Sequence, residues 1–408
     1  MTDKPLRGVV VCDYGQHGAG SACGRVLADW GAEVIKVEPV WGDPSHMSGR
    51  MVGLPVEEDC NPHYELINCG KKSIAVNLKT PQGMKIMDQI IARSNIFFSN
   101  YRLASLKKFG LDYETLSAKY PRLIWGHLSG FGTQGYLGTA PGFDNASYWA
   151  YGGLLMEGAN PDAPPKTNPF GGGDVMTGYV LASSMAACLY QQAVTGKGQS
   201  VYTSLYGTGC WQDACVIQGA ASGGMQRSTK PGPLDGFKKS ADNVWFTLGI
   251  MDYSKIGPRL AKLIGREDWQ TLFAARETLV AASAEVQPVL ENFFATHTWP
   301  QLDEMLASID IVRCRVNRPG EVASEAQAIA NGFVSDYVLP NGSHTTMVST
   351  PVKFGREDVI ETSPAPYIGE QTTEILTWLG YEDSAIRQLM DAGIIAQHNR
   401  PVEEKKCQ

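Results

Sequence analysis

The chain has 408 residues, of which 43% are hydrophobic and 19% charged, with a formal net charge of −7, values that are ordinary for a folded protein of two domains. The acidic balance argues against a nucleic-acid-binding surface. No apolar run reaches membrane-spanning length, and Met1 to Pro5 lead almost directly into a predicted strand, so we expect neither a membrane span nor a signal peptide. The nine cysteines form no C-x-x-C pair and the seven histidines show no zinc spacing, which predicts free thiols, no metal site and a cytoplasmic location.

The first predicted elements are a strand, a glycine-rich turn, a helix and a second strand, over residues 8–12, 15–20, 21–30 and 32–37. This order begins a doubly wound sheet. Gly18, Gly20 and Gly24, with the acidic Glu38 after the second strand, resemble a dinucleotide-binding fingerprint. The last glycine comes one residue late, so nicotinamide binding and a plain tight turn are equally supported here.

Alternating helices and strands continue to about residue 205. The further strands are predicted at 73–78, 95–98, 123–128 and 200–205. Thr80 and Pro81 predict a helix start, with Thr as the N-cap and Pro at the first helical position. The pattern therefore predicts an α/β fold with a Rossmann-like large domain over residues 1–221.

The composition changes after this domain. Residues 222–237 are rich in glycine and proline and predict a linker. A smaller α+β domain is predicted over 238–331, with strands at 243–250 and 309–316 and helices at 252–264, 284–296, 299–307 and 321–331. A return segment over 332–408 is predicted to hold a hairpin at 334–348, turning at Pro340–Gly342, and helices at 369–379 and 383–393.

Asp174 follows three glycines, Gly171 to Gly173, and precedes a predicted helix over 175–194. Glycines lack a β-carbon, so a bulky ligand could approach the backbone closely. At a helix N-terminus, unsatisfied N–H groups could stabilise an oxyanion, and the helix dipole would favour an ionised carboxylate. The alternative is an ordinary N-cap. The triple glycine favours a catalytic role.

Basic residues cluster near predicted strand ends, where α/β sheets bind ligands. They are Lys71, Lys72, Lys79, Arg102, Lys107 and Lys108. Such residues are most often solvated surface charges. A polyanionic cofactor would require a group of this kind.

An ordered series of motifs resembles the class III CoA-transferases, which include formyl-CoA transferase and carnitine CoA-transferase. The motifs are Asp13–Glu38, Asn68–Ser73, Leu78–Gly83, Ser129–Gly132, and Gly173-Asp174 with Gly178. The resemblance covers nearly the whole chain. It implies an interlocked homodimer, with the C-terminal helices packing on the large domain. It also implies acyl-CoA and carboxylic acid substrates and no tightly bound cofactor.

The resemblance implies that Asp174 is the nucleophile. It would attack the donor thioester, form a mixed anhydride and then an aspartyl-CoA thioester. CoA contacts are implied at Gly18, Ala19, Val76, Asn77, Leu78, Lys79, Asn100, Tyr101, Arg102 and Lys108. We place the substrate pocket at Phe143, Asp144, Gly172 and Gly173. Two departures from the family pattern are Pro39, where some members carry an arginine, and the lack of a glycine-rich covering loop in the second domain.

The acceptor is predicted from three segments that resemble the phenyllactate and 2-hydroxyisocaproate transferases of amino-acid fermentation: Asn100–Arg102, Gly110–Leu116 and Pro141–Asp144. Aromatic residues ahead of the glycines, Phe143, Tyr148, Trp149 and Tyr151, are predicted to line an apolar pocket. Ser129–Gly132 and Ala295–Thr298 resemble the carnitine enzyme equally well, so a carnitine-type transferase remains an alternative.

Three further alternatives remain, the first of which is implied by the family resemblance. An acyl-CoA racemase of the same fold would use a His-Asp pair, but Phe143 stands where the histidine is found, and phenylalanine transfers no proton. A nicotinamide-dependent oxidoreductase rests on the Gly18 region. A non-catalytic CoA-binding protein would leave Asp174, and equally Asp144, as backbone caps.

Overall fold

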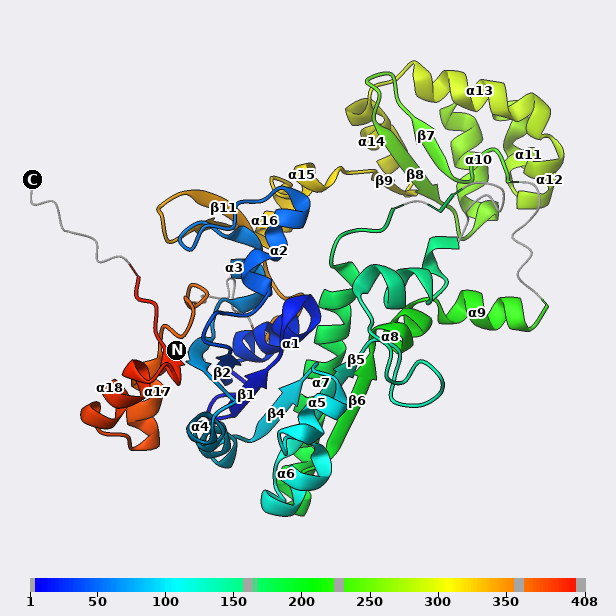
Figure 1. The fold of residues 1–408 in the computed structure, drawn as a ribbon. Coiled ribbons are helices and arrows are strands. Elements are labelled where there is room, and N and C mark those ends of the chain that lie inside the picture. The colour runs from blue at the N-terminus through cyan, green and yellow to red at the C-terminus, as the bar shows by residue number, and fades with distance from the viewer. Residues whose placement is uncertain (1–3, 157–163, 166, 224–230, 356–362, 401–408) are drawn as a thin grey trace, which may run out of the picture. The chain divides into compact units, whose positions relative to one another are not determined.

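The computed structural model describes residues 4–156, 164–165, 167–223, 231–355 and 363–400 (Figure 1). The chain divides into two compact units. Unit 1 comprises Met1–Gln218 and Ala326–Gln408, and unit 2 comprises Gly219–Glu325. In the described part of the chain, no helix combines the length and the apolar character that a bilayer crossing requires.

Unit 1 is built on a seven-stranded sheet with the order β12-β3-β2-β1-β4-β5-β6. Its strands are β1 (Val10–Tyr14), β2 (Glu33–Glu38), β3 (Lys72–Val76), β4 (Ile96–Ser99), β5 (Ile124–Ser129), β6 (Ser200–Ser204) and β12 (Ile395–Ala396). The first six are parallel, and β12 pairs antiparallel with β3. The strand order reverses between β1 and β4, which leaves a crevice at their carboxyl ends. The mixed α/β class with a mostly parallel sheet is confirmed.

Helices cover both faces of this sheet (Figure 1). Val11 packs in a core with α1 (His17–Asp29) and α7 (Gly172–Thr195), whereas Cys12 packs on the other face with α4 (Pro81–Ala92). Successive strand residues point to opposite faces, so both sets are apolar. Gly178 lets α7 approach α1 closely, because a β-carbon there would lie 2.7 Å from the carbonyl oxygen of Ala19.

The other helices of unit 1 connect these strands or follow the sheet. They are α2 (Ser45–Ser48), α3 (Pro62–Asn68), α5 (Leu103–Lys108), α6 (Tyr113–Lys119), α8 (Leu205–Gln212), α9 (Ala214–Ala221, at the boundary with unit 2), α16 (Ala326–Ala330), α17 (Thr372–Leu379) and α18 (Asp383–Asp391). The Thr80 cap is confirmed, since its side chain accepts from the N–H of Gly83 at 3.0 Å. The predicted hairpin is confirmed as β10 (Val334–Val338) and β11 (His344–Val348).

Unit 2 holds a three-stranded antiparallel sheet, ordered β7 (Phe237–Lys239), β8 (Trp245–Gly249) and β9 (Val312–Arg315). Its helices are α10 (Tyr253–Leu263), α11 (Gln270–Phe273), α12 (Arg276–Ala281), α13 (Ser283–Ala295), α14 (Trp299–Ala307) and α15 (Pro319–Val322). Phe246, Phe273 and Phe294 are fully buried and form part of its separate core.

Candidate active site

Asp174 lies inside the first turn of α7 and not ahead of it. The helix begins at Gly172, and its N-cap is Gly171, which adopts the left-handed conformation with φ of 69°. Glycine adopts this conformation without strain. The alternative that Asp174 is the N-cap is therefore wrong. Among the described residues, none donates a hydrogen bond to its carboxylate. The Asp174 side chain therefore does not cap the helix.

The Asp144 carboxylate binds the backbone amides at the start of α7, which we considered as donors to an oxyanion. The N–H of Asp174 donates to Oδ1 of Asp144 at 3.0 Å, and the indole N–H of Trp149 donates to Oδ2 at 3.2 Å. The amides of Gly171 and Gly173 also favour the Asp144 carboxylate. The interpretation of Asp144 as a cap of backbone amides is therefore confirmed, and its carboxylate occupies the amides that we considered for an oxyanion.

The two carboxyl groups influence each other's ionisation. Burial, with a smaller contribution from the charge of Asp144, raises the pKa of Asp174 from 3.8 to about 7. Burial also raises the pKa of Asp144, although its hydrogen bonds to backbone amides oppose this shift. We expected the helix dipole to keep Asp174 ionised. Desolvation outweighs the dipole because the side chain is largely enclosed.

A cavity of about 760 Å³ opens at the carboxyl ends of β1, β4 and β5, where the strand order reverses. It brings together six of the predicted site residues: Ala19, Asn100, Tyr101, Arg102, Phe143 and Asp174. Gly18 lies directly against Asp174, since a β-carbon there would overlap the Asp174 carboxylate and lie 2.9 Å from its carboxyl carbon. This cavity is the candidate active site.

Other predicted site residues lie outside the lining of this cavity. Val76 and Leu78 are buried in the core on the α4 face of the sheet. Asn77 accepts a hydrogen bond from the N–H of Lys79, and the side chains of Lys79 and Lys108 are exposed. Gly172 and Gly173 form the start of α7, beside Trp149 and Tyr148. Contacts of these residues with CoA or substrate stay predictions.

The aromatic segment before the glycines forms a π-helix over Asp144–Ala150, which the sequence did not indicate. Only Phe143 of the four aromatic residues lines the cavity. Tyr148 is buried, with its hydroxyl bonded to Gln212, and Trp149 bonds Asp144. Of the four rings, the expected lining is thus reduced to one, because Tyr148 turns into the core, Trp149 turns toward Asp144, and the exposed Tyr151 pairs with Tyr136.

A buried charge network that the sequence did not reveal lies under the loop after β1. Lys36 pairs with Asp43 and also donates to the carbonyl of Gly15 at 3.3 Å. Lys71, expected among solvated or anion-binding charges, is instead buried and pairs with Asp13 at 2.9 Å. A buried lysine requires such a partner, since an isolated charge in the interior is strongly disfavoured. The sequence pattern around Lys36 and Lys71 did not predict these two ion pairs.

Glu38 belongs to the same region and is also enclosed. Its carboxylate accepts from the hydroxyl of Ser73 and from the N–H of Asp43 at 3.0 Å. The ring of His46 approaches it at 3.0 Å. A carboxylate that binds a dinucleotide ribose must face the ligand. The Glu38 carboxylate is bound by groups of the protein itself. The dinucleotide-fingerprint interpretation of the Gly18 region therefore lacks an acidic residue that faces the ligand.

His17 is a cavity residue that sequence reasoning did not single out. It is the first residue of α1 and has a positive φ of 56°. Its N–H donates to Oδ1 of Asp43 at 3.1 Å, and its ring meets Phe143 edge-on, with centroids 6.1 Å apart. The signal in the sequence that could have identified His17 is a histidine within a segment of glycines, between Gly15 and Gly18.

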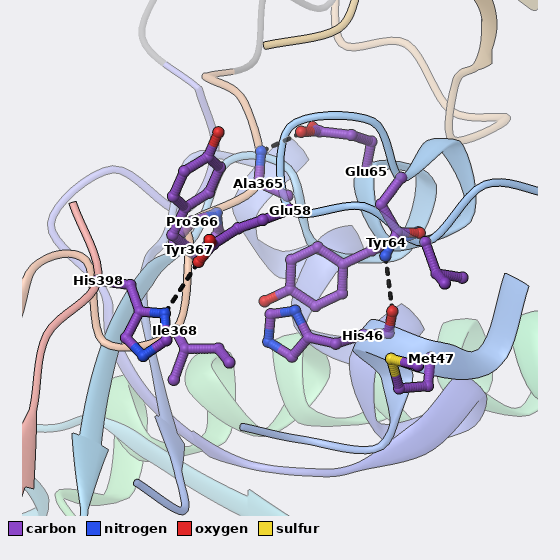
Figure 2. A pocket seen from close by; sticks show the side chains of 12 residues that line it. His46, Met47, Glu58, Tyr64, Glu65, Ala365, Pro366, Tyr367, Ile368 and His398 are labelled. Carbon is purple, nitrogen blue, oxygen red and sulfur yellow. Dashed lines mark hydrogen bonds and ion pairs between the residues drawn. The ribbon is translucent and has the colours of Figure 1, made fainter. Parts of the chain in front are cut away.

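A second, smaller cavity of about 230 Å³ lies between the region of α2 and α3 and the segment 365–368 (Figure 2). His46 stacks on Tyr64 with ring centroids 3.9 Å apart, and Glu65 accepts from the N–H of Ala365 at 2.7 Å. His398 pairs with Glu58 at 2.9 Å. The Ala365 and His398 contacts connect the C-terminal segment of unit 1 to its N-terminal part. Glu65 lies in the first turn of α3, but its carboxylate accepts from the N–H of Ala365 and the hydroxyl of Tyr337, which sets this site apart from Asp174.

Comparisons with known proteins identify the family of this chain. The model of CoA-transferase family III matches residues 6–372. The chain is 31% identical to the (R)-2-hydroxy-4-methylpentanoate CoA-transferase of Clostridioides difficile, over 96% of this chain and 99% of that one. It is 33% identical to the cinnamoyl-CoA:phenyllactate CoA-transferase of Clostridium sporogenes, over 94% and 95%. A CAIB/BAIF family protein from Brucella suis superposes with a TM-score of 0.78 at 26% identity, covering 93% of this chain and 100% of that one. The chain therefore belongs to CoA-transferase family III, as its motifs predicted.

Proposed function

We propose that this enzyme transfers CoA from an acyl-CoA donor to a 2-hydroxy acid through covalent intermediates on Asp174. The observation that carries the proposal is the Asp174 carboxylate at the cavity wall, with Gly18 opposite and no hydrogen bond from a described residue to its oxygens. The names of two relatives, at 31% and 33% identity, contain 2-hydroxy acids, which supports this class of acceptor.

The proposed reaction begins when an Asp174 oxygen attacks the thioester carbon of the donor. The C–S bond breaks, CoA leaves as the thiolate, and a mixed anhydride remains. The thiolate attacks the Asp174 carbonyl carbon and releases the donor acid, which leaves an aspartyl-CoA thioester. The acceptor carboxylate displaces the thiolate to form a second anhydride. The thiolate then attacks the acceptor's acyl carbon, which yields the new thioester and frees Asp174.

Gly18 and burial of Asp174 suit this chemistry in different ways. The missing β-carbon leaves room beside the carboxylate for a thioester. A partly desolvated carboxylate with a pKa of about 7 is more basic than an exposed aspartate, which favours attack by its ionised form. The large cavity has space for an acyl group and part of the CoA chain.

The decisive experiment is intact mass spectrometry after incubation with an acyl-CoA. The wild-type chain is expected to gain a CoA thioester adduct that hydroxylamine or borohydride removes or converts, and peptide mapping is expected to place it on Asp174. The Asp174→Asn variant keeps the side-chain shape and provides the control. An adduct on another carboxylate, or none under turnover conditions, would refute the mechanism.

Side-by-side kinetics test the acceptor. We expect phenyllactate and 2-hydroxy-4-methylpentanoate to be used with higher kcat/KM than carnitine or γ-butyrobetaine. The reverse order would refute the 2-hydroxy acid acceptor and leave the Asp174 mechanism intact. α-Proton exchange is not expected, since Phe143 stands at the position where the racemases of this fold carry their histidine.

We also propose that the enzyme is a homodimer. Large apolar side chains of unit 1 are highly exposed in the single chain, including Met51 at 79%, Tyr190 at 77% and Trp211 at 80%. Association with a second chain would remove apolar surface of this kind from water. Small-angle scattering at micromolar concentration should give the mass of two chains, and a monomer would contradict the proposal.

A further inference from the structure

We propose that His17 is the residue that recognises the 2-hydroxyl group of the acceptor acid. This inference rests on the proposed function, since it assigns a specificity residue to the Asp174 cavity. His17 lines the same cavity as Asp174. The next residue, Gly18, is in direct contact with the Asp174 carboxylate, so His17 stands one residue from the reacting group.

The backbone of His17 is held in a conformation that a side chain disfavours. Its φ of 56° lies in the left-handed region, where a residue other than glycine is strained. Neighbouring positions carry glycine, at Gly15, Gly18 and Gly20. Strain of this kind persists where the surrounding structure imposes it, and it is concentrated at functional sites. A histidine retained where glycine would be unstrained indicates a use for the imidazole ring.

Buried groups fix the loop on both sides of His17. Asp43 accepts from the His17 N–H at 3.1 Å and is itself paired with Lys36. The side chain of Asn100 accepts from the N–H of Gln16 and donates to its carbonyl, both at 2.8 Å. The backbone that carries the imidazole is therefore held in place before a substrate arrives, which lowers the entropic cost of binding.

The ring of His17 is available to a ligand, whereas the side chains of Asn100 and Ser129 in the same cavity are engaged by the protein. In the described part of the chain, no residue forms a hydrogen bond with its ring nitrogens. The Asn100 amide is used on Gln16, and the Ser129 hydroxyl accepts from the N–H of Gly132 at 3.0 Å and donates to the carbonyl of Thr203. Phe143 meets the imidazole edge-on and provides an apolar neighbour for an acyl tail.

The chemistry of a 2-hydroxy acid matches this arrangement. Its hydroxyl lies on the carbon next to the carboxyl carbon, which reacts at Asp174. A hydroxyl both donates and accepts a hydrogen bond, and a neutral imidazole provides one nitrogen of each kind. One residue adjacent to the nucleophile can thus bind the hydroxyl while the carboxylate reacts. A site built to bind a substrate hydroxyl discriminates against an analogue that lacks it.

The test compares matched acceptors on the full-length enzyme. Phenyllactate is paired with 3-phenylpropanoate, and 2-hydroxy-4-methylpentanoate with 4-methylpentanoate, which differ only in the hydroxyl. For the wild type we expect a higher kcat/KM for each hydroxy acid. His17→Gly, which fits the positive φ without strain, is expected to lower kcat/KM for the hydroxy acids on the order of tenfold. The deoxy acids should change little.

Controls separate this inference from the proposed function. Phe143→Leu reduces contact with the acyl tail and should affect both members of each pair alike. Formation of the Asp174 thioester from an acyl-CoA without a hydroxyl should survive in His17→Gly. If no wild-type adduct forms, the proposed function itself fails. If the adduct forms and His17→Gly lowers both members of a pair equally, or neither, then His17 does not recognise the hydroxyl.

Discussion

Gly18 and Asp174 are in contact at the first turns of α1 and α7, so closely that a β-carbon on residue 18 would lie 2.9 Å from the carboxyl carbon of Asp174. The two helices also pack against each other at Gly178. The space beside the proposed nucleophile is thus defined by the absence of one methyl group. A substitution that adds a methyl group at residue 18 tests this close contact directly.

Gly18→Ala is expected to reduce kcat/KM strongly, because the added methyl group displaces the Asp174 carboxylate. Overpacking of this kind typically costs about 1–3 kcal/mol, so a small loss of Tm is expected as well. Gly320→Ala is the matched control, since no atom lies within 4 Å of a β-carbon there. Steady-state kinetics and thermal unfolding measure both effects. Near-normal activity in Gly18→Ala would contradict the close contact.

Asp174→Asn is expected to abolish transfer and yet stabilise the fold at pH 8. The pKa of Asp174 is raised from 3.8 to about 7, so the folded chain holds a proton that the unfolded chain has lost. The contribution of Asp174 to the free energy of unfolding therefore falls as the pH rises from 3.8 to about 7. After allowance for partial exposure, we expect a gain on the order of 1 kcal/mol, or a few degrees in Tm. The gain should vanish near pH 4, and a pH-independent difference would argue against the raised pKa.

The pH profile of kcat/KM should show an acid limb near pH 7, because the protonated form of Asp174 is a poor nucleophile. Asp144→Asn removes the neighbouring charge and should move this limb to lower pH. The limb should remain well above 3.8, since burial is the larger cause of the shift. A limb that stays in place would show that the charge of Asp144 does not reach Asp174.

Lys71→Met and Lys72→Met form a matched pair of neighbouring substitutions. Lys71 is buried and its loss leaves Asp13 without its charge partner, which should cost about 3–5 kcal/mol of unfolding free energy. Lys72 pairs with Glu33 and Glu374 on the surface, so its loss should cost about 1 kcal/mol or less. Chemical denaturation of both variants measures the difference, and equal losses would contradict the buried role of Lys71.

The sequence predicted most elements because local signals mark their ends. Thr80 and Pro81 start α4, and Asn341-Gly342 turn the β10–β11 hairpin, as expected from cap and turn chemistry. β12 was not predicted, since two residues carry no periodicity and their strand exists only through pairing with β3.

The site was predicted less completely, for a related reason. Asp174 stood out through its glycines, but its relation to Asp144 depends on a π-helix that no local pattern indicated. The burial of Lys71 likewise results from contacts between segments distant in sequence. Single residue types indicate chemistry, whereas their protonation and partners depend on tertiary packing.

The position of β12 has a consequence for biosynthesis. β3 is completed on its outer edge by a strand near the end of the chain, and residue Ser73 is bonded there to Gln371 and Gly369. While the ribosome still holds these residues, the nascent sheet presents an unpaired edge, which is prone to intermolecular pairing. Translation of all of unit 2 separates the synthesis of β3 from that of its last partner. A premature stop before residue 395 therefore leaves this edge of the sheet open to pairing with other chains.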